Sequence, residues 1–279
     1  MNRYKFMLCW FFATATSLLI AQGTYARIAF PASTSTVAYG INSKGDVSGY
    51  YTDTNNNFHG FLLRSGKYTS IDYPGSTSTI VYGLNDSDDV VGFSANSDVG
   101  FVYQSSTQSF TELTYPGASA TIPAAINNAG LVCGSFGPVS YSAGFEFDGS
   151  TYTEILPPGA FLAFLNGVDS RGACVGNWAS FLRKSGNFSF HDGRYSHIKI
   201  PAYKLVWGVN PAGTAFVGSW RVGANSQIGF LYQNQIFQKI RVPGSTGTIA
   251  YGINSAGAVV GAYGDLSGQW GFLWTPPAK

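Results

Sequence analysis

Six side chains in the second half of the sequence combine aromatic rings with long cationic groups. They are Phe161, Phe181, Arg183, Lys184, Tyr203 and Lys204. Aromatic faces stack on sugar rings and on apolar peptide side chains, and guanidinium or ammonium groups donate hydrogen bonds beside them. These six residues are therefore the candidate ligand-binding residues, and ordinary drift of surface loops is the alternative interpretation.

Carboxylate chemistry has weaker support. Glycoside hydrolysis normally uses a pair of acidic side chains, and the chain has only three glutamates, Glu112, Glu146 and Glu154. Neither the Gly-x-Ser-x-Gly motif of a nucleophile elbow nor the Ser-x-Asp-x-Gly-x-Thr-Trp box of sialidases occurs. No catalytic residue is assigned, and a polysaccharide hydrolase or lyase built from distant loops is an alternative function.

Metal and cofactor chemistry is not indicated. His59, His191 and His197 lack the spacing of zinc ligands. The segment "NDSDD" (85–89) lacks the full spacing and the terminal glutamate of a calcium loop. We therefore assign no metal ligand and no cofactor.

Two cysteines, Cys133 and Cys174, follow the N-terminal segment. They occupy neighbouring repeat units, one alignment position apart, on what we expect to be the same strand of each unit. That offset makes a disulfide geometrically conceivable, and a secreted setting would permit it. Two buried free thiols are the favoured interpretation, and the disulfide is the alternative.

The elements that position these residues repeat along the chain. A Gly-Ile-Asn motif recurs six times at steps of about 42 residues, at 40–42, 83–85, 125–127, 167–169, 208–210 and 252–254. The aspartate or asparagine that ends each motif is expected to stabilise a turn by bonding its own backbone two residues on. Internal repetition of this length is typical of repeat folds and propellers.

One unit consists of four short segments rich in β-branched and aromatic residues. In the first unit they are "VAYGIN" (37–42), "VSGYY" (47–51), "HGFLL" (59–63) and "YTSIDY" (68–73). Glycine-containing turns separate them, and glycine adopts backbone angles that other residues avoid. Six four-stranded units predict an all-β, six-bladed β-propeller, with a β-solenoid as the alternative.

The last unit lacks its fourth strand, because the chain ends at "GFLWTPPAK" (271–279). The missing pattern occurs at the start, where Tyr25, Ile28 and Pro31 repeat the spacing of a fourth strand. We therefore predict that an N-terminal strand completes the last blade and closes the ring. Residues 24–279 are expected to form a single propeller domain.

The first 23 residues are predicted to be a signal peptide. Arg3 and Lys5 precede an apolar run over 6–20, and small residues follow at Ala21 and Gly23. The run is shorter than the roughly 20 residues of a membrane span, so an uncleaved anchor is the weaker alternative. The mature chain is expected to be secreted or periplasmic, with no transmembrane segment.

Charge argues against nucleic-acid partners. Removal of residues 1–23 leaves fourteen basic and fourteen acidic residues. Binding to a phosphate backbone needs a basic excess, which the mature chain lacks overall, and a locally basic patch is the alternative. Its 11% of charged residues and its 35 glycines are unusual for an average globular protein.

The candidate ligand-binding residues stand where the units stop agreeing. The crossings between units read "PASTST", "PGSTST", "PGASAT" and "PGSTGT" in four places. They change to "PGAFLA" (158–163) and "PAYKLV" (201–206) before units four and five, and the loop "NWASFLRKS" (177–185) of unit four is also irregular. We expect these segments to cluster on one face over blades four and five.

The units resemble the HAF probable extracellular repeat of secreted bacterial proteins. The resemblance rests on "HGF" (59–61), the nearest match to the His-Ala-Phe core, and on segments of the "GINxxGxVVG" type, and it extends over the mature chain. It implies a secreted repeat protein without a settled activity. Together with the residues above, it suggests non-catalytic binding of an extracellular glycan or protein, and a structural role in an envelope or matrix is a further alternative.

Overall fold

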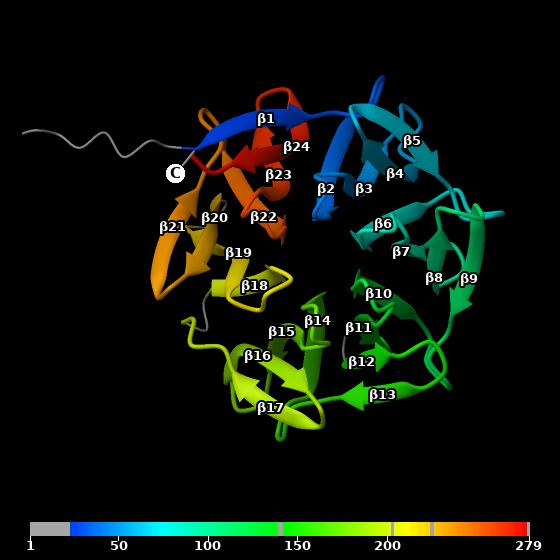
Figure 1. The fold of residues 1–279 in the computed structure, drawn as a ribbon, viewed down its shortest axis with the longest axis vertical. Coiled ribbons are helices and arrows are strands. Elements are labelled where there is room, and N and C mark those ends of the chain that lie inside the picture. Colours follow the sequence, from blue (N-terminus) through cyan, green and yellow to red (C-terminus); the bar gives the residue numbers. More distant parts are fainter. Residues whose placement is uncertain (1–22, 139–141, 202–203, 224–225, 278–279) are drawn as a thin grey trace, which may run out of the picture.

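A computed structural model describes residues 23–138, 142–201, 204–223 and 226–277. The predicted signal peptide lies outside these residues, apart from Gly23. Six four-stranded antiparallel sheets surround a central axis, as predicted (Figure 1). Among the described residues no helix is long and apolar enough to cross a membrane.

Each blade runs from an inner strand at the axis to an outer strand at the rim. Blades one to three contain β2 (Ser35–Ile41), β3 (Val47–Thr52), β4 (Phe58–Arg64), β5 (Lys67–Ile71); β6 (Thr79–Leu84), β7 (Val90–Ser94), β8 (Val99–Gln104), β9 (Ser109–Leu113); and β10 (Thr121–Ile126), β11 (Val132–Phe136), β12 (Ala143–Phe147), β13 (Tyr152–Ile155). Blades four to six contain β14 (Leu162–Val168), β15 (Cys174–Ala179), β16 (Ser185–His191), β17 (Arg194–His197); β18 (Lys204–Val209), β19 (Ala215–Val222), β20 (Ser226–Gln233), β21 (Ile236–Ile240); and β22 (Gly247–Ile253), β23 (Val259–Asp265), β24 (Gly268–Thr275), β1 (Thr24–Ile28).

The N-terminal strand closes the ring. Strand β1 pairs antiparallel with β24, from Thr24 opposite Thr275 to Ile28 opposite Gly271. The side chain of Ile28 is buried, and the Tyr25 hydroxyl accepts a hydrogen bond of 3.0 Å from the backbone N–H of Arg241 in blade five. The predicted closure of the last blade by an N-terminal strand is therefore confirmed.

The blades pack on one another through a phenylalanine that recurs on the third strand of every blade. All six are buried: Phe61, Phe101, Phe145, Phe188, Phe230 and Phe272. Each lies opposite a glycine of the second strand, as Phe61 lies opposite Gly49. A Cβ atom at Gly49 would stand 2.9 Å from the Phe61 ring, so the glycine makes room for the buried ring.

The asparagine belt is the set of repeated polar residues at one end of the inner strands, and three of its members, Asn42, Asn127 and Asn254, donate a hydrogen bond to the next blade. The Asn42 Oδ1 accepts hydrogen bonds from the backbone N–H groups of Lys44 and Asp46, which is the predicted turn role. Its Nδ2 also donates to the Asn85 carbonyl of the next blade. Asn254 donates in the same way to Asn42 at 3.0 Å, across the closure. The repeated polar residue therefore joins blades as well as shaping turns.

Blades three and four are also joined covalently. Cys133 of β11 and Cys174 of β15 form a disulfide, with 6.1 Å between their Cα atoms. The preference for free thiols is thus corrected in favour of the alternative. The offset of one position places the two side chains on opposite faces of equivalent strands, and those faces meet between adjacent blades.

Candidate functional site

The structure brings together the two aromatic residues predicted for blade four. Phe161 precedes β14 and Phe181 lies in the turn between β15 and β16, and their rings stack with centroids 4.3 Å apart. Phe181 remains 80% exposed, and so does its neighbour Leu182. Leu182 was not among the predicted residues, although it continues the same apolar turn.

The predicted cationic residues are divided between two environments. Arg183 and Lys184 are exposed in the β15–β16 turn, where Arg183 has a positive φ of 58° and its N–H donates to the Ser180 carbonyl. Lys204 begins β18, and its Nζ lies over the rings of Phe237 and Trp220 of its own blade, 5.0 and 5.6 Å from their centroids. Tyr203 lies outside the described residues.

A second candidate site, not predicted from the sequence, is a central channel of about 490 Å³ along the propeller axis. Its lining comes from the inner strands of all six blades, β2, β6, β10, β14, β18 and β22, and from the turns that follow them. The size falls within the range of pockets that bind small ligands.

A β-bulge in every inner strand aims one side chain into this channel. The pairing register shifts at Tyr39 in β2, at Ala124 in β10 and at Trp207 in β18, and in the same way in β14 and β22. In β6 the shift leaves both Tyr82 and Gly83 out of the ladder. A bulged residue is left out of the ladder, and its side chain is re-aimed. The six bulge residues are Tyr39, Tyr82, Ala124, Asn166, Trp207 and Tyr251, and all of them line the channel.

Four of these residues form a continuous aromatic arc, defined here as Trp207, Tyr251, Tyr39 and Tyr82, from blades five, six, one and two. Ring centroids are 5.8 Å apart for Trp207 and Tyr251, 4.3 Å for Tyr251 and Tyr39, and 4.9 Å for Tyr39 and Tyr82. All four rings are half-buried. The glycine after each ring lets the strands approach closely, since a Cβ at Gly252 would stand 2.5 Å from the Tyr39 carbonyl oxygen.

Blades three and four leave a gap opposite the aromatic arc. The bulge residue of blade three is the small Ala124, and that of blade four is the polar Asn166. The Nδ2 of Asn166 donates a hydrogen bond to the Val206 carbonyl at 3.0 Å. Ser135 and the 36% exposed ring of Phe164 also line this side. The channel thus has one wall of four packed aromatic rings, and a second wall that combines small and hydrogen-bonding side chains with the single ring of Phe164.

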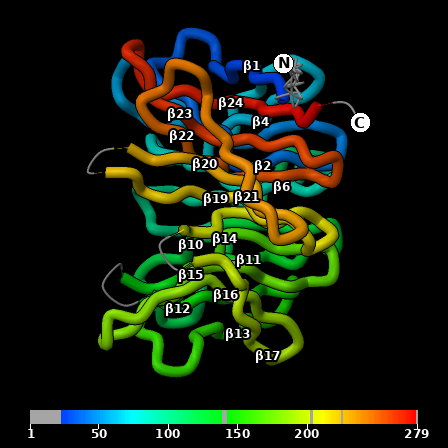
Figure 2. The backbone as a smooth tube through the Cα atoms, turned by 90° about the vertical axis from the view of Figure 1, so that its left-hand side faces the viewer, coloured from blue at the N-terminus to red at the C-terminus, as the bar shows by residue number. Residues whose placement is uncertain are grey.

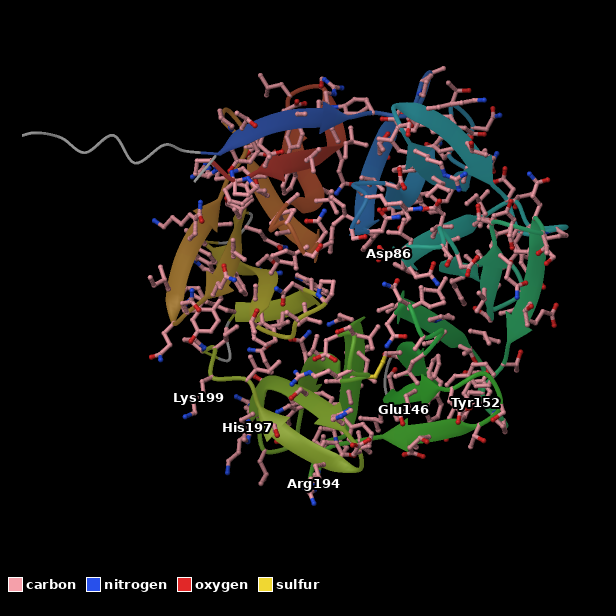
Figure 3. The ribbon with its side chains drawn as sticks, in the orientation of Figure 1. Asp86, Glu146, Tyr152, Arg194, His197 and Lys199 are labelled. Carbon is pink, nitrogen blue, oxygen red and sulfur yellow. A yellow bond between two sulfur atoms is a disulfide. The ribbon has the colours of Figure 1, made fainter. Side chains whose placement is uncertain are left out.

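The mouth of the channel carries one carboxylate. Asp86 lies near the axis in Figure 3, whereas Arg194, His197 and Lys199 lie on the outer rim of blade four. Burial opposes ionisation of Asp86, but hydrogen bonds from Ser43 and Asn128 outweigh it and lower the pKa of its carboxyl. Among the described residues that line the channel, Asp86 is the only charged one.

The phenols of the aromatic arc are held in their neutral form. Burial, together with the neighbouring phenols of Tyr251 and Tyr82, raises the pKa of Tyr39 well above its ordinary value. Burial raises the pKa of Tyr251 to about 12 and also raises that of Tyr82. The channel wall therefore offers uncharged rings and hydroxyls across the physiological pH range.

The residues considered for hydrolysis and for metal binding lie elsewhere. Glu112, Glu146 and Glu154 are on β9, β12 and β13, outside the channel lining. His59 lies between two carboxylates, with Nδ1 2.8 Å from Asp72 and Nε2 3.4 Å from Asp53. Within the described part of the chain, no group of three or more His, Cys, Asp or Glu residues could hold a metal ion.

One sequence signal could have revealed the channel. The residue before the glycine of each repeat motif is aromatic in four of the six units, as in "AYGIN", "VYGLN" and "VWGVN". The alternation of side chains along a regular strand gives no reason to place this residue in a channel rather than in the core between blades. The bulge, which sends the side chain to the axis, became visible only in the strand register.

Comparison with known proteins relates the chain to other propellers by fold. Virginiamycin B lyase from Staphylococcus aureus, solved also as a catalytically inactive variant with quinupristin, is 14% identical over 90% of this chain and 99% of the lyase, with a TM-score of 0.53. AofleA from Arthrobotrys oligospora is 8% identical over 91% of this chain and 88% of its own, with a TM-score of 0.54.

TolB from Acinetobacter baumannii is 9% identical over 88% of this chain and 64% of TolB, with a TM-score of 0.56. At these identities the likeness shows a shared propeller fold. Neither the protein-family models nor the sequences of curated proteins give a match.

Proposed function

We propose that this chain is a secreted, non-catalytic propeller that binds an extracellular glycan, and that the central channel receives a neutral sugar unit of that glycan. The observation that carries the proposal is the bulge that aims a side chain from every blade into one channel, with aromatic rings on one wall and a gap on the other. The predicted signal peptide and the resemblance to extracellular HAF repeats support the secreted setting.

The chemistry of the wall favours an uncharged sugar. Sugar rings present C–H faces that stack on aromatic rings, and hydroxyls that exchange hydrogen bonds with amides and serines. Tyr82 of blade two ends the aromatic arc beside the gap, and Ser135 of blade three and Asn166 of blade four line the channel beyond it. An anionic sugar would meet no cationic partner among the described residues of the lining and would be repelled by Asp86 at the mouth.

The test is a glycan array probed with the purified chain and with two channel variants. Tyr82→Ala removes a stacking ring and is expected to raise the Kd for the bound glycan at least about tenfold. Ala124→Tyr fills the gap and is expected to abolish binding. Ile236→Ser is the matched control, because Ile236 is an exposed apolar residue at the start of β21, the outer strand of blade five, and does not line the channel.

Three outcomes would overturn the channel as the binding site. The first is that neither wild type nor control binds any neutral glycan. The second is that Phe181→Ala with Arg183→Ala and Lys184→Ala abolishes binding while Tyr82→Ala does not, which would place the glycan on blade four. The third is release of shortened saccharides during incubation, which would favour the hydrolase or lyase alternative.

A further inference from the structure

The hairpin turns that join the second and third strands carry exposed apolar side chains in three consecutive blades. Phe181 and Leu182 stand in the β15–β16 turn, Val222 ends β19, and Leu266 lies in the β23–β24 turn. Leu266 is fully exposed, Phe181 and Leu182 are 80% exposed, and Val222 is 44% exposed. We call these four residues the apolar rim.

The topology places the apolar rim on one face of the disc. Every blade runs in the same sense from axis to edge, so all turns between second and third strands point to the same side. Viewed edge-on in Figure 2, the ends of β19 and β20 and the β23–β24 turn project to that side. The asparagine belt follows the first strands and therefore lies on the opposite face.

Blades one and two differ from this pattern at the equivalent turns. The β3–β4 turn reads "DTNNN" (53–57) and the β7–β8 turn reads "ANSD" (95–98). Desolvation opposes ionisation of Asp53, but hydrogen bonds from Asn57, Asn55 and His59 outweigh it and lower the pKa of the carboxyl to about 2, so that turn carries a fixed negative charge. The most exposed apolar side chains of this face therefore lie over blades four to six, beside one carboxylate, that of Asp265, whereas the turns of blades one and two are polar and carry Asp53 and Asp98.

Basic side chains accompany the apolar rim. Arg183 and Lys184 follow Phe181 and Leu182 directly, and Arg221 precedes Val222; all three are exposed. The one carboxylate beside Leu266, that of Asp265, accepts hydrogen bonds from the backbone N–H and the hydroxyl of Ser267 within its own turn. Exposed apolar tips flanked by cations are the combination that binds a lipid surface carrying negative headgroups.

We propose that blades four to six dock on an anionic membrane surface, with the apolar rim inserted among the headgroups and with Arg183, Lys184 and Arg221 at the phosphates. The rim consists of separate protruding tips, one blade apart. A bilayer accepts such tips wherever they fall, whereas a folded protein partner would need a matching pocket for each. The acidic turns of blades one and two would be repelled, so the disc would tilt onto blades four to six.

The test is co-sedimentation of the chain from residue 24 onward with vesicles of equal parts phosphatidylglycerol and phosphatidylcholine, or of phosphatidylcholine alone. Wild type is expected to bind the anionic vesicles and to lose binding as salt increases. Leu266→Ser, and Phe181→Ser with Leu182→Ser, should each lower the partition coefficient at least about tenfold. Arg183→Gln with Lys184→Gln should lower it about 25-fold, since each basic residue contributes about fivefold.

Two control variants distinguish docking through the rim from general adhesion to lipid and from binding through the channel. Ile236→Ser, an equally apolar surface change at the first residue of the fourth strand of blade five, should bind vesicles like wild type. Tyr82→Ala should also bind them, because the docking does not depend on the channel. Thermal unfolding of each variant identifies any that fails to fold, and the charge variant alters only exposed side chains.

The proposal is overturned if wild type sediments with neither vesicle, or if the rim variants bind as wild type does. It is also overturned if the rim substitutions dissociate a dimer seen by analytical ultracentrifugation without lipid, and wild type leaves vesicles unbound. That last result would assign the rim to a second copy of this chain.

Discussion

The junction between blades six and one and the junction between blades three and four share the same polar belt. At the ring closure, Asn254 donates to the Asn42 carbonyl at 3.0 Å. At the other junction, Asn127 donates to the Asp169 carbonyl, also at 3.0 Å. The belt hydrogen bonds are therefore equivalent at two opposite places in the ring.

The two junctions differ in the side chains that lie closer to the channel. Tyr251 and Tyr39 pack with ring centroids 4.3 Å apart at the closure. The equivalent residues of blades three and four, Ala124 and Asn166, carry no rings, and these blades are bridged by a disulfide instead. The two opposite junctions therefore differ in kind: one has packed aromatic rings beside the channel, and the other has a covalent link between the second strands of its blades.

Removal of the disulfide should have the largest effect on stability and tests the difference between the two junctions most directly. Cys133→Ala with Cys174→Ala should lower the free energy of unfolding by about 4 kcal/mol, because the bridge closes a loop whose ends are 41 residues apart. Urea unfolding under non-reducing conditions measures the loss. An unfolding free energy unchanged from wild type would show that blades three and four hold together without the bridge.

The aromatic junction should instead be sensitive to high pH. The pKa of Tyr251 is raised to about 12 in the folded state and is about 10 when unfolded. The stabilisation is therefore fully present below about pH 10 and is lost as pH rises from about 10 toward 12, by about 2 kcal/mol.

Urea unfolding of wild type and of Tyr251→Phe at ~pH 9 and ~pH 11.5 measures this effect. The phenylalanine variant lacks the ionisable hydroxyl and should lose less stability at the higher pH. Equal losses in the two proteins would rule out Tyr251 as the origin.

The shared belt predicts equal effects at the two junctions. Asn254→Ala and Asn127→Ala each remove one donor to the next blade and one acceptor of two backbone N–H groups in the turn. Each substitution should cost about 2 kcal/mol, since buried backbone groups lose their partners. Thermal unfolding compares the pair, and a clear difference between the two would contradict the equivalence.

The smallest effect is expected in the gap itself. Asn166 donates to the Val206 carbonyl, but Asn177 donates to the same oxygen at 3.0 Å. Asn166→Ala should therefore change the free energy of unfolding by less than about 1 kcal/mol, because the acceptor keeps a partner. The same variant on the glycan array sharpens the comparison, since it should weaken glycan binding while leaving stability nearly intact.

The features that repeat could be predicted from the sequence. The spacing of the Gly-Ile-Asn motif indicated six blades, and the match of Tyr25 and Ile28 to a fourth strand indicated the closure. The turn role of the asparagines followed from their own chemistry. Their bonds to the next blade did not, because a repeat shows equivalent positions and does not show which neighbouring units touch.

The candidate site was harder to predict for the same reason. Phe161 and Phe181 can be singled out because they depart from the repeat pattern, and their rings stack in the structure. Tyr39 and Tyr251 follow the repeat pattern, so the sequence does not distinguish them, although a bulge directs them to the axis. The rings of Phe237 and Trp220, over which the Lys204 ammonium lies, belong to its own blade and could not be predicted from its position in a crossing.

The pairing of β1 with β24 also determines when, during synthesis and folding, the ring can close. The ribosome makes β1 first and β24 last, so the first strand has no partner until the whole chain has been synthesised. A long-range pairing of this kind forms late, after the local hairpins of each blade. If the predicted signal peptide directs export, the ring can close only after the last strand has also crossed the membrane.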